Sequence, residues 1–338
     1  MSGGATATGI AGWGVYVPDH RRTNAELEQT LDTNDTWIVE RTGIRERRIA
    51  APDETTATMA IAAGAAAVKD AGLAPGDIDL VIVATITPDQ ICPATASFVS
   101  DGLGLTCGSF DLGAACAGFA YAVVVASSMI ATGGIGTALV IGSETLSRFT
   151  DPEDRSTCVI FGDGAGAAVL RAGGAGEGGL AGPGLLAWDL GCDGSAANLI
   201  EIPAGGSRLP ATAATLAGRQ HFLQMQGNEV FRRAVRAVVD SAALTLDKAG
   251  LKPADVDLFV PHQANVRIIE AINARLGIPL DKTVVNIDRY GNTSAASIPL
   301  ALAEASADGR LEPGDVVLVS GFGAGMTWAS LLLRWGES

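Results

Sequence analysis

The stretch AGLAPGDIDL at residues 71–80 returns almost unchanged as AGLKPADVDL at residues 249–258. The same shift along the chain superimposes GTALVI at residues 136–141 on GDVVLV at residues 314–319. Two matches at one offset are hard to obtain by chance, and we infer that the chain holds two copies of one α/β unit. A fold of two pseudo-symmetric halves would pack its sheets against shared central helices.

A glycine-rich segment separates the two copies. Residues 172–179 read AGGAGEGG, a composition typical of a loop between structural units. We therefore predict an N-terminal half over residues 1–175 and a C-terminal half over residues 176–338.

Strands and helices alternate within the first copy. A first strand is expected at residues 9–16, followed by a helix that Thr23 or Asn24 caps. An alanine-rich helix is expected at residues 56–71, and the β-branched run at residues 79–85 is typical of a strand covered on both faces. This alternation with glycine turns indicates a layered α/β architecture.

Two further stretches invite other interpretations. Residues 121–142 are apolar over about the thickness of a membrane, but ATGGIG at residues 131–136 interrupts them. We interpret the stretch as a buried helix, a turn and a buried strand rather than a transmembrane helix. The GDGAG at residues 162–166 lacks the spacing of a dinucleotide-binding loop, and we interpret it as a tight turn between strands.

The composition excludes several classes of protein. The chain has 338 residues, of which 48% are hydrophobic and 18% charged, so it can build a sizeable core. Its formal net charge of -14 argues against nucleic-acid binding, which needs a basic surface. Five cysteines without a C-x-x-C pair indicate neither a disulfide framework nor a zinc site. With no visible signal peptide, the sequence favours a reducing, cytoplasmic compartment.

Cys116 lies where a strand is expected to meet a helix. Residues 108–112 predict a short buried strand, and residues 117–131 are apolar and long enough for a buried helix. A thiol on the first helical turn faces unpaired N–H groups and the positive end of the helix dipole, so we expect a lowered pKa and a nucleophilic sulfur. From this window alone, an inert buried cysteine is an equally good interpretation.

The repeat places two further polar residues near Cys116. Its shift maps Cys116 onto Ser294 and puts His262 just past a buried strand, at the edge where open α/β sheets bind ligands. Asn292 lies in GNTSAAS at residues 291–297, which opens the equivalent helix. A Cys, a His and an Asn that face one another suit acyl transfer through a thioester. Taken alone, His262 is more often structural and Asn292 is more often a turn residue.

A glycine-rich stretch near the C-terminus, GFGAGM at residues 321–326, follows another predicted strand at residues 316–320. Its backbone could aim N–H groups at an oxyanion. Simple turn chemistry explains the glycines equally well.

Together, these motifs resemble those of β-ketoacyl-[acyl carrier protein] synthase III. The motifs are WIVERTG at residues 37–43, DLGAACAGF at 111–119, MQGNEVF at 225–231, PHQAN at 261–265, GNTSAAS at 291–297 and GFGAG at 321–325. The resemblance implies an α/β protein with the thiolase fold, in which two pseudo-symmetric halves form an α-β-α-β-α arrangement. It also implies a homodimer.

The resemblance implies a condensing enzyme, an acyltransferase that uses no metal or other cofactor. Cys116 would take the acyl group from an acyl-CoA primer, and malonyl-[acyl carrier protein] would then lose carbon dioxide and attack the acyl-cysteine. The product would be 3-oxoacyl-[acyl carrier protein], in fatty-acid initiation or polyketide priming. His262 and Asn292 would donate hydrogen bonds to the enolate, and the backbone N–H groups of Cys116 and Ala324 would form the oxyanion hole.

The resemblance also assigns residues that bind the two substrates. Trp37 would stack on the CoA adenine, with Arg41 and Arg155 nearby. Arg232 and Arg267 would receive the acidic carrier protein. Three more arginines would extend this basic patch: Arg233, Arg236 and Arg275. The spacing of those between residues 232 and 236 suits a solvated helix face equally well.

Cys92, Met225 and Phe322 would line the acyl pocket. At position 92 some members of the family carry a bulky Phe that crosses the dimer interface and limits the pocket, so Cys92 predicts a roomier one. The sequence leaves the primer and the pathway open. Two other functions also stay open: an acyltransferase that moves the acyl group to an alcohol or amine without decarboxylation, and a catalytically silent partner subunit.

Overall fold

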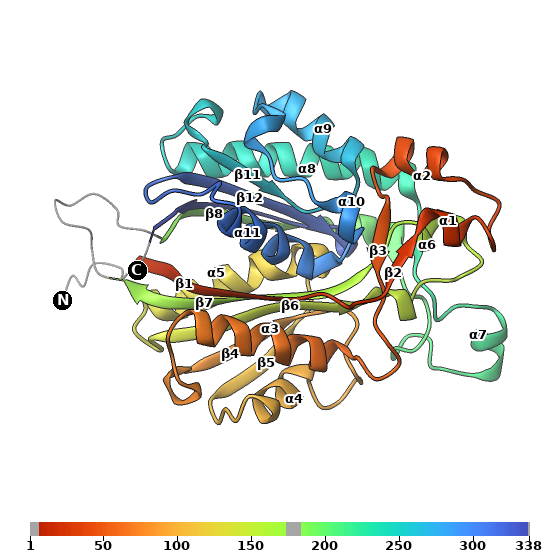
Figure 1. Cartoon of the computed structure of the whole chain (residues 1–338), viewed down its shortest axis with the longest axis horizontal. Coiled ribbons are helices and arrows are strands. Elements are labelled where there is room, and N and C mark those ends of the chain that lie inside the picture. Colours follow the sequence, from red (N-terminus) through yellow and green to blue (C-terminus); the bar gives the residue numbers. More distant parts are fainter. Residues whose placement is uncertain (1–6, 174–183, 337–338) are drawn as a thin grey trace.

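Two mixed β-sheets lie one above the other, with helices between and outside them (Figure 1). The structure is a computed structural model and describes residues 7–173 and 184–336. The first sheet contains, in spatial order, β1 (Ala7–Tyr16), β7 (Asp163–Gly173), β6 (Thr137–Thr145), β4 (Leu80–Ala84) and β5 (Gly108–Leu112). The second sheet contains β11 (Leu258–Pro261), β12 (Val316–Gly323), β13 (Thr327–Arg334) and β8 (Gly184–Cys192).

The two sheets repeat one topology. In the first sheet, β4 pairs in parallel with β5 and β6, while β7 pairs antiparallel with β6 and β1. In the second sheet, β11 is parallel to β12, and β13 is antiparallel to β12 and β8. The series β4, β6, β7, β1 therefore corresponds to β11, β12, β13, β8, and the duplication that the sequence predicts is confirmed.

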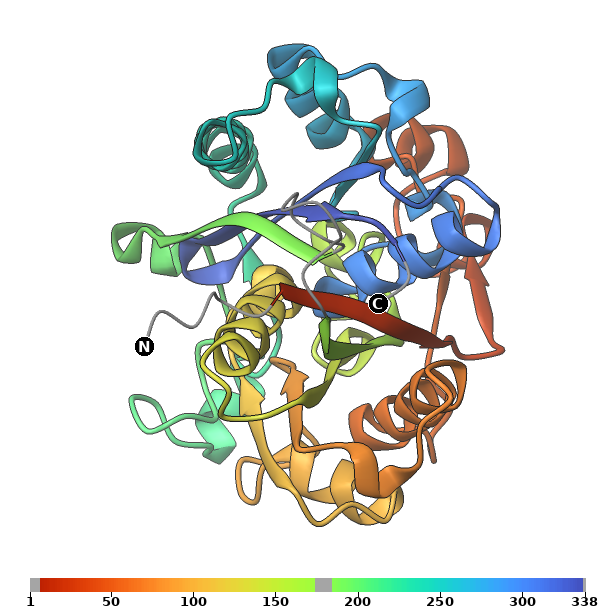
Figure 2. The ribbon, with the colours of Figure 1, turned by 90° about the vertical axis from the view of Figure 1, so that its left-hand side faces the viewer.

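The helices complete a five-layer arrangement. Between the sheets lie α5 (Gly118–Ala131) and α11 (Ser297–Ala307), whose buried side chains form one core with both sheets. The outer face of the first sheet is covered by α3 (Thr56–Asp70) and α4 (Thr95–Gly102), and that of the second by α8 (Gly227–Lys248) and α9 (Val266–Leu276). Figure 2 shows the outer helices above and below the two sheets. This is the α-β-α-β-α layering that the resemblance implies.

Short elements gather at one end of these layers, on the right of Figure 1. They are β2 (Arg21–Thr23), α1 (Asn24–Leu27), α2 (Asp35–Thr42), β3 (Glu46–Arg48), α6 (Arg155–Cys158), α7 (Ala213–Ala217) and α10 (Ile287–Tyr290). A two-stranded sheet of β9 (Ile200–Glu201) and β10 (Gln224–Met225) completes the fold.

Most predicted elements lie where the sequence places them. The expected first strand, alanine-rich helix and covered strand are β1, α3 and β4, and Thr23 caps α1 by accepting a hydrogen bond from the amide of Glu26. The apolar residues 121–142 form most of α5, a turn and the start of β6. Within the described ranges, no helix combines the length and apolar character needed to span a membrane. The predicted boundary at residues 175/176 lies outside the described residues.

The prediction of a tight turn at residues 162–166 is wrong, because β7 begins at Asp163 and contains Gly164 and Gly166. Gly166 leaves no room for a side chain: a Cβ there would lie 2.8 Å from Cβ of Pro299 on α11. Glycine at this position therefore lets the central helix approach the sheet closely.

Candidate active site

Cys116 lies just after β5, on a short 3-10 turn that leads into α5. This turn, η2 (Ala115–Ala117), begins with Ala115 at a φ of +47°, a left-handed conformation that costs a non-glycine residue about 1–2 kcal/mol. The end of β12 packs directly against the turn, because a Cβ at Gly323 would lie only 2.5 Å from the amide nitrogen of Cys116. The predicted strand-to-helix position of Cys116 is confirmed.

The second half carries the same turn. In this half, η7 (Ser294–Ala296) begins with Ser294 at a φ of +48° and leads into α11. The structure therefore pairs Ser294 with Ala115, and the mapping of Cys116 onto Ser294 is wrong by one position. The reason is that the second half has one more residue between its first parallel strand and this turn.

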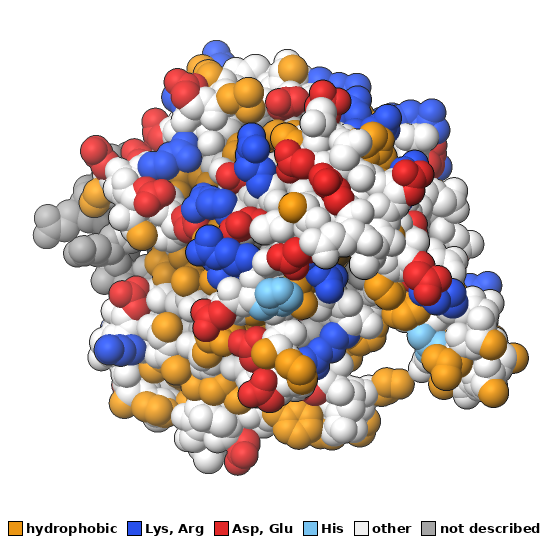
Figure 3. Space-filling view, turned by 45° about the vertical axis from the view of Figure 1, so that its right-hand side comes forward, with side chains coloured by type: hydrophobic (Ala, Val, Ile, Leu, Met, Phe, Trp, Pro, Cys, Tyr) orange, Lys and Arg blue, Asp and Glu red, His pale blue; other side chains and the backbone are white. Residues whose placement is uncertain are grey.

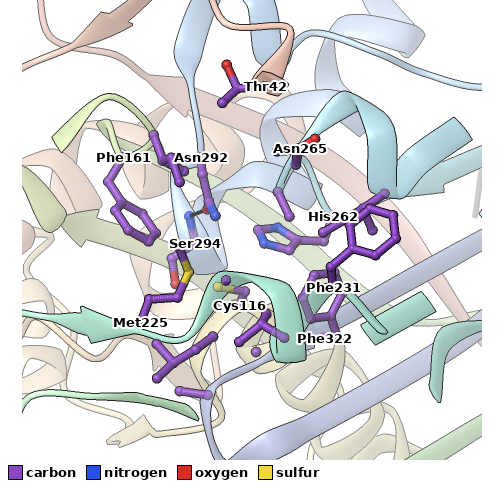
Figure 4. Close-up of a pocket in the computed structure, with 18 of the residues that line it drawn as sticks. Thr42, Cys116, Phe161, Met225, Phe231, His262, Asn265, Asn292, Ser294 and Phe322 are labelled. Atoms are coloured by element: carbon purple, nitrogen blue, oxygen red, sulfur yellow. Dashed lines mark hydrogen bonds between the residues drawn. The ribbon is translucent and has the colours of Figure 1, made fainter. Parts of the chain in front are cut away.

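Cys116, His262 and Asn292 line one cavity of about 570 Å³. His262 directly follows β11. The backbone of Asn292 is fixed by hydrogen bonds to Ile160 and Gly162, at 2.9 and 3.0 Å. Figure 4 shows the imidazole and the carboxamide next to one another above the sulfur. The structure thus brings together the three side chains that the sequence places at comparable edges of the two halves.

The ring of His262 is held in one orientation. Its Nδ1 lies 2.6 Å from Oγ of Ser297, and Phe322 packs against it in an edge-to-face arrangement with centroids 5.5 Å apart. When the Ser297 hydroxyl donates to Nδ1, the proton of the neutral ring is on Nε2. Burial lowers the pKa of His262 to about 3, which keeps the ring neutral. Nε2 finds no protein partner among the described residues and is free to bond to a ligand in the cavity that His262 lines.

Asn292 presents a second donor. The backbone N–H of Ser294 donates to Asn292 Oδ1 at 2.9 Å. Because this bond occupies the oxygen, the carboxamide offers its Nδ2 hydrogens to the cavity. His262 and Asn292 can therefore donate to the same oxygen of a ligand.

A buried carboxyl group that the sequence analysis missed lies next to Ser294. Glu144, on β6, is 0% exposed. It accepts hydrogen bonds from the hydroxyls of Thr85, Thr87 and Ser294 and from the amides of Ile86 and Thr87. Burial raises its pKa to about 7. A single charged residue at the end of the otherwise uncharged strand TALVIGSET is the signal that could have found it.

The surroundings of Cys116 overturn the expectation of a lowered pKa. Burial raises the pKa of its thiol to about 12, an effect that hydrogen bonding to Ser294 partly offsets and the charge of Glu144 increases. The resting group is a thiol, and it needs a proton acceptor before the sulfur can attack.

The backbone of Cys116 and Ala324 borders the same cavity. Ala324 begins the 3-10 turn η8 (Ala324–Met326), directly after the end of β12 that packs on Cys116. Both residues line the cavity, and the role of their amides as an oxyanion hole stays a prediction.

Trp37 lies at the mouth of the cavity, within cation–π range of two guanidinium groups. Arg41 is 4.9 Å and Arg155 is 5.1 Å from the centroid of its ring. Trp37 and Arg41 are on α2, and Arg155 begins α6. A partly buried indole beside two cations suits a planar base that carries phosphates, and the structure brings the three predicted residues together.

Arg232 on α8 and Arg267 on α9 border the same mouth. Glu229 forms ion pairs with both Arg232 and Arg233, and the neighbouring Arg236 also has an acidic partner. By contrast, Arg267 forms no ion pair within residues 7–173 and 184–336. Figure 3 shows acidic and basic side chains interspersed over one face of the molecule. The charge of α8 is largely neutralised, whereas Arg267 and Arg41 line the cavity without an ion pair among the described residues.

An apolar chamber extends from Cys116 into the protein. Its walls include Ile86, Leu146, Phe161, Ile200, Leu223 and Met225. Met225 and Phe322 both line the cavity, as predicted, and Phe322 also contacts His262. Cys92 is exposed and is not part of the cavity wall of this chain. A contribution of Cys92 to the pocket requires a partner protomer and stays a prediction.

Comparisons with known proteins give one consistent result. Family models described as 3-oxoacyl-[acyl-carrier-protein (ACP)] synthase III and its C terminal match residues 110–194 and 246–335. The β-ketoacyl-[acyl-carrier-protein] synthase III of Desulfitobacterium hafniense is 53% identical over 98% of this chain and 98% of its own. The 3-oxoacyl-[acyl-carrier-protein] synthase III of Aquifex aeolicus superposes with a TM-score of 0.88, at 44% identity, over 97% of this chain and 100% of its own. The priming β-ketosynthase of the R1128 polyketide pathway superposes with a TM-score of 0.89, at 36% identity, over 98% and 97%.

Proposed function

The chain belongs to the 3-oxoacyl-[acyl carrier protein] synthase III family, and on this premise we propose how its residues catalyse the condensation. It is a condensing enzyme of the thiolase fold that joins an acyl group to the carbanion released when malonyl-[acyl carrier protein] loses carbon dioxide. One observation supports the assignment of roles above all others: Cys116 from one half and His262 and Asn292 from the other line one cavity.

In the first half-reaction, Cys116 attacks the thioester carbonyl of an acyl-CoA, and CoA leaves. The N–H groups of Cys116 and Ala324 stabilise the tetrahedral oxyanion. Trp37 binds the adenine, and Arg41 and Arg155 bind the phosphates near it. The acyl chain enters the apolar chamber beyond Cys116.

In the second half-reaction, the costly species is the enolate formed on decarboxylation. His262 Nε2–H and Asn292 Nδ2–H donate hydrogen bonds to its thioester oxygen. Both donors are fixed before the charge develops, by Ser297 and by the amide of Ser294 respectively. Donors that are already oriented in a water-poor site favour the transition state without reorganising. The carbanion then attacks the acyl-cysteine and releases 3-oxoacyl-[acyl carrier protein].

Arg267, with Arg232, receives the acidic carrier protein. Arg267 is the stronger of the two candidates because Arg232 is already paired with Glu229. A free cation at the cavity mouth speeds encounter with an acidic partner and orients it, which explains how so acidic a chain accepts another acidic protein.

The enzyme acts as a homodimer through the edge of its first sheet. The outermost strand, β5, has an unpaired edge and exposes Phe110, which is 37% accessible. Phe98 on α4 and Ile91 add exposed apolar surface, at 38% and 85% accessibility. An unpaired edge with apolar side chains around it favours pairing with a second copy. A second copy also offers the route by which Cys92 reaches an acyl pocket.

The reaction runs on side chains and backbone alone, with acyl-CoA as a substrate rather than a cofactor. Within residues 7–173 and 184–336, no three His, Cys, Asp or Glu side chains form a group that could hold a metal ion. The five free cysteines suit a cytoplasmic location.

Mixing the protein with a panel of acyl-CoAs and weighing it by mass spectrometry tests this proposal. We expect an acyl adduct on Cys116 and none in Cys116→Ala. Adding malonyl-[acyl carrier protein] should release carbon dioxide and the 3-oxoacyl product. An adduct without carbon dioxide release would favour transfer to an alcohol or amine, and no adduct at any chain length would favour a silent subunit.

Asn292→Ala tests the division of roles within the site. Because Asn292 acts on the enolate, decarboxylation should fall by about 10²–10³-fold, the usual loss for one such donor, while acylation of Cys116 changes far less. Equal losses in both half-reactions would contradict the roles assigned to Cys116 and Asn292.

A further inference from the structure

The thiol of Cys116 has to lose a proton, and His262 is poorly placed to take it. The proposed decarboxylation step needs Nε2–H as a donor, which places the ring proton on Nε2 and leaves Nδ1 to accept from Ser297 Oγ, its hydrogen-bond partner among the described residues. A neutral imidazole with this tautomer has no free lone pair for the thiol proton.

Another group lies beside the sulfur. Ser294 and Cys116 line the same cavity, and the turns η2 and η7 that carry them pack against each other. The hydroxyl of Ser294 donates to Glu144 Oε1 at 2.9 Å. Glu144 is fully buried, and within the described ranges no Lys, Arg or His forms an ion pair with it. The carboxylate therefore has donors but no cation to hold its charge.

We propose that Glu144 accepts the thiol proton of Cys116 through the hydroxyl of Ser294 and returns it when the sulfur leaves the condensed product. This proposal rests on the acyl-cysteine step assigned above. Glu144 does not touch the substrate, so it is a positioning residue that acts on Cys116 through Ser294.

The proton transfers balance over the two half-reactions. In acylation, the S–H bond breaks and the sulfur keeps its electron pair to form the bond to the acyl carbon. The thiol proton passes to Ser294 Oγ, while the hydroxyl proton of Ser294 passes to Glu144. CoA leaves as a thiolate and takes a proton from solvent. In condensation, Cys116 leaves as a thiolate and recovers its proton from Glu144 by the reverse path.

The groups around Glu144 suit a proton that is held for a time and then returned. The loop after β4 faces it with Thr85, Thr87 and the amide of Ile86, the turn η7 with Ser294, and η2 with the thiol of Cys116. The pKa of Glu144 is raised to about 7, close to the pH at which it has to accept and release the proton.

We call this proton transfer from Cys116 through Ser294 to Glu144 the relay. The pH dependence of Cys116 acylation tests it. The acylation rate is measured in single turnovers with acyl-CoA and without carrier protein. In the unmodified enzyme the rate should rise with pH and level off above about 7, where Glu144 is ionised. Glu144→Gln and Ser294→Ala should each lose about 10²-fold near neutral pH, the lower range for general base catalysis. In both variants the rate should keep rising tenfold per pH unit, because only the free thiolate reacts. Glu144→Asp should recover part of the loss.

Asp163→Asn is the matched control. Asp163 is also a buried carboxyl with a raised pKa, but it binds Ser147 and the amide of Ala50 and does not line the cavity. This variant should keep the plateau in the pH profile. The relay would be overturned if a folded Glu144→Gln or Ser294→Ala enzyme kept the pH–rate profile of the unmodified enzyme. It would also be overturned if His262→Ala lost as much acylation rate as is expected for Glu144→Gln. If the unmodified enzyme forms no adduct, the proposed function itself fails instead.

A second measurement uses the unmodified chain and so does not depend on the folding of a variant. Infrared difference spectra should show a new C=O band of a buried carboxylic acid when the acyl-enzyme forms. Labelling glutamate with carbon-13 should shift this band, and adding malonyl-[acyl carrier protein] should remove it. Acyl-enzyme formation without such a glutamic acid band would contradict the proposal.

Discussion

Ser297 Oγ lies 2.6 Å from Nδ1 of His262, so the first residue of a central helix determines which nitrogen of the imidazole faces the cavity. The helix α11 packs between both sheets, and its first turn therefore carries little freedom. The orientation of His262 thus follows from the core of the fold as well as from the site.

The burial of His262 predicts a pH-dependent loss of stability. Its pKa is about 3 in the folded protein, below the 6.5 of an exposed histidine. Between these values the unfolded chain binds a proton that the folded protein excludes, so the free energy of unfolding falls as pH falls. At pH 5.0 the cost is about 2 kcal/mol. Urea unfolding at pH 7.5 and 5.0 should show this extra loss in the unmodified chain and not in His262→Asn, since other titrating groups are common to both. Equal losses would exclude a buried neutral His262.

Trp37→Ala should weaken binding of acyl-CoA without slowing chemistry. Loss of one stacked base costs about 1–3 kcal/mol, so KM for acyl-CoA should rise about tenfold or more while kcat changes little. The matched control is Trp188→Ala, which removes another partly exposed indole that lies 5.7 Å from a cation, Lys248. Steady-state kinetics with varied acyl-CoA give the comparison. An unchanged KM in Trp37→Ala would exclude Trp37 from the CoA site.

Arg267→Glu should raise KM for malonyl-[acyl carrier protein] and leave acylation by acyl-CoA nearly unchanged. The effect should shrink as salt is added, because exposed charges are screened. Arg236→Glu is the control on the same side, since Arg236 is already compensated by an acidic partner. If KM for malonyl-[acyl carrier protein] rises equally in both variants, the carrier protein responds to the overall charge of the surface rather than to Arg267.

Gly323→Ala should displace the nucleophile. The added Cβ would lie 2.5 Å from the amide nitrogen of Cys116, a contact that backbone atoms can relieve only by moving. Because a shift of about 1 Å costs about 10²-fold in rate, acylation should fall by this order. Gly76→Ala, where no atom lies within 4 Å of the new Cβ, should retain full activity. An active, folded Gly323→Ala enzyme would show that the position of Cys116 does not depend on β12.

The repeat could be predicted from the sequence because both copies keep the same residues at the same turns. AGLAPGDIDL and AGLKPADVDL each lead into the first parallel strand of their half. The position of Gly166 inside β7 could not be predicted. A glycine is needed there because Pro299, on the distant helix α11, leaves no room for a side chain. Packing contacts between different layers of the fold do not produce a periodic pattern of residues in the sequence.

The polar residues that line the cavity could be predicted, whereas the groups that support them could not. Cys116, His262 and Asn292 each follow a recognisable strand or turn. Glu144 is 150 residues from its partner Ser294, and nothing local in the sequence links the two. The raised pKa of Cys116 was missed for a similar reason, since the helix start is local but the depth of burial depends on the whole fold.

Both halves of the protein enter their central helix through a left-handed residue, Ala115 in one and Ser294 in the other. The doubled architecture therefore offers two equivalent places for chemistry, and the chain divides the labour between them. One holds the reactive sulfur, and the other holds the serine that, in the proposed proton transfer, serves this sulfur. Because the two turns are equivalent in the fold, their residues can take different roles while their side chains remain close together.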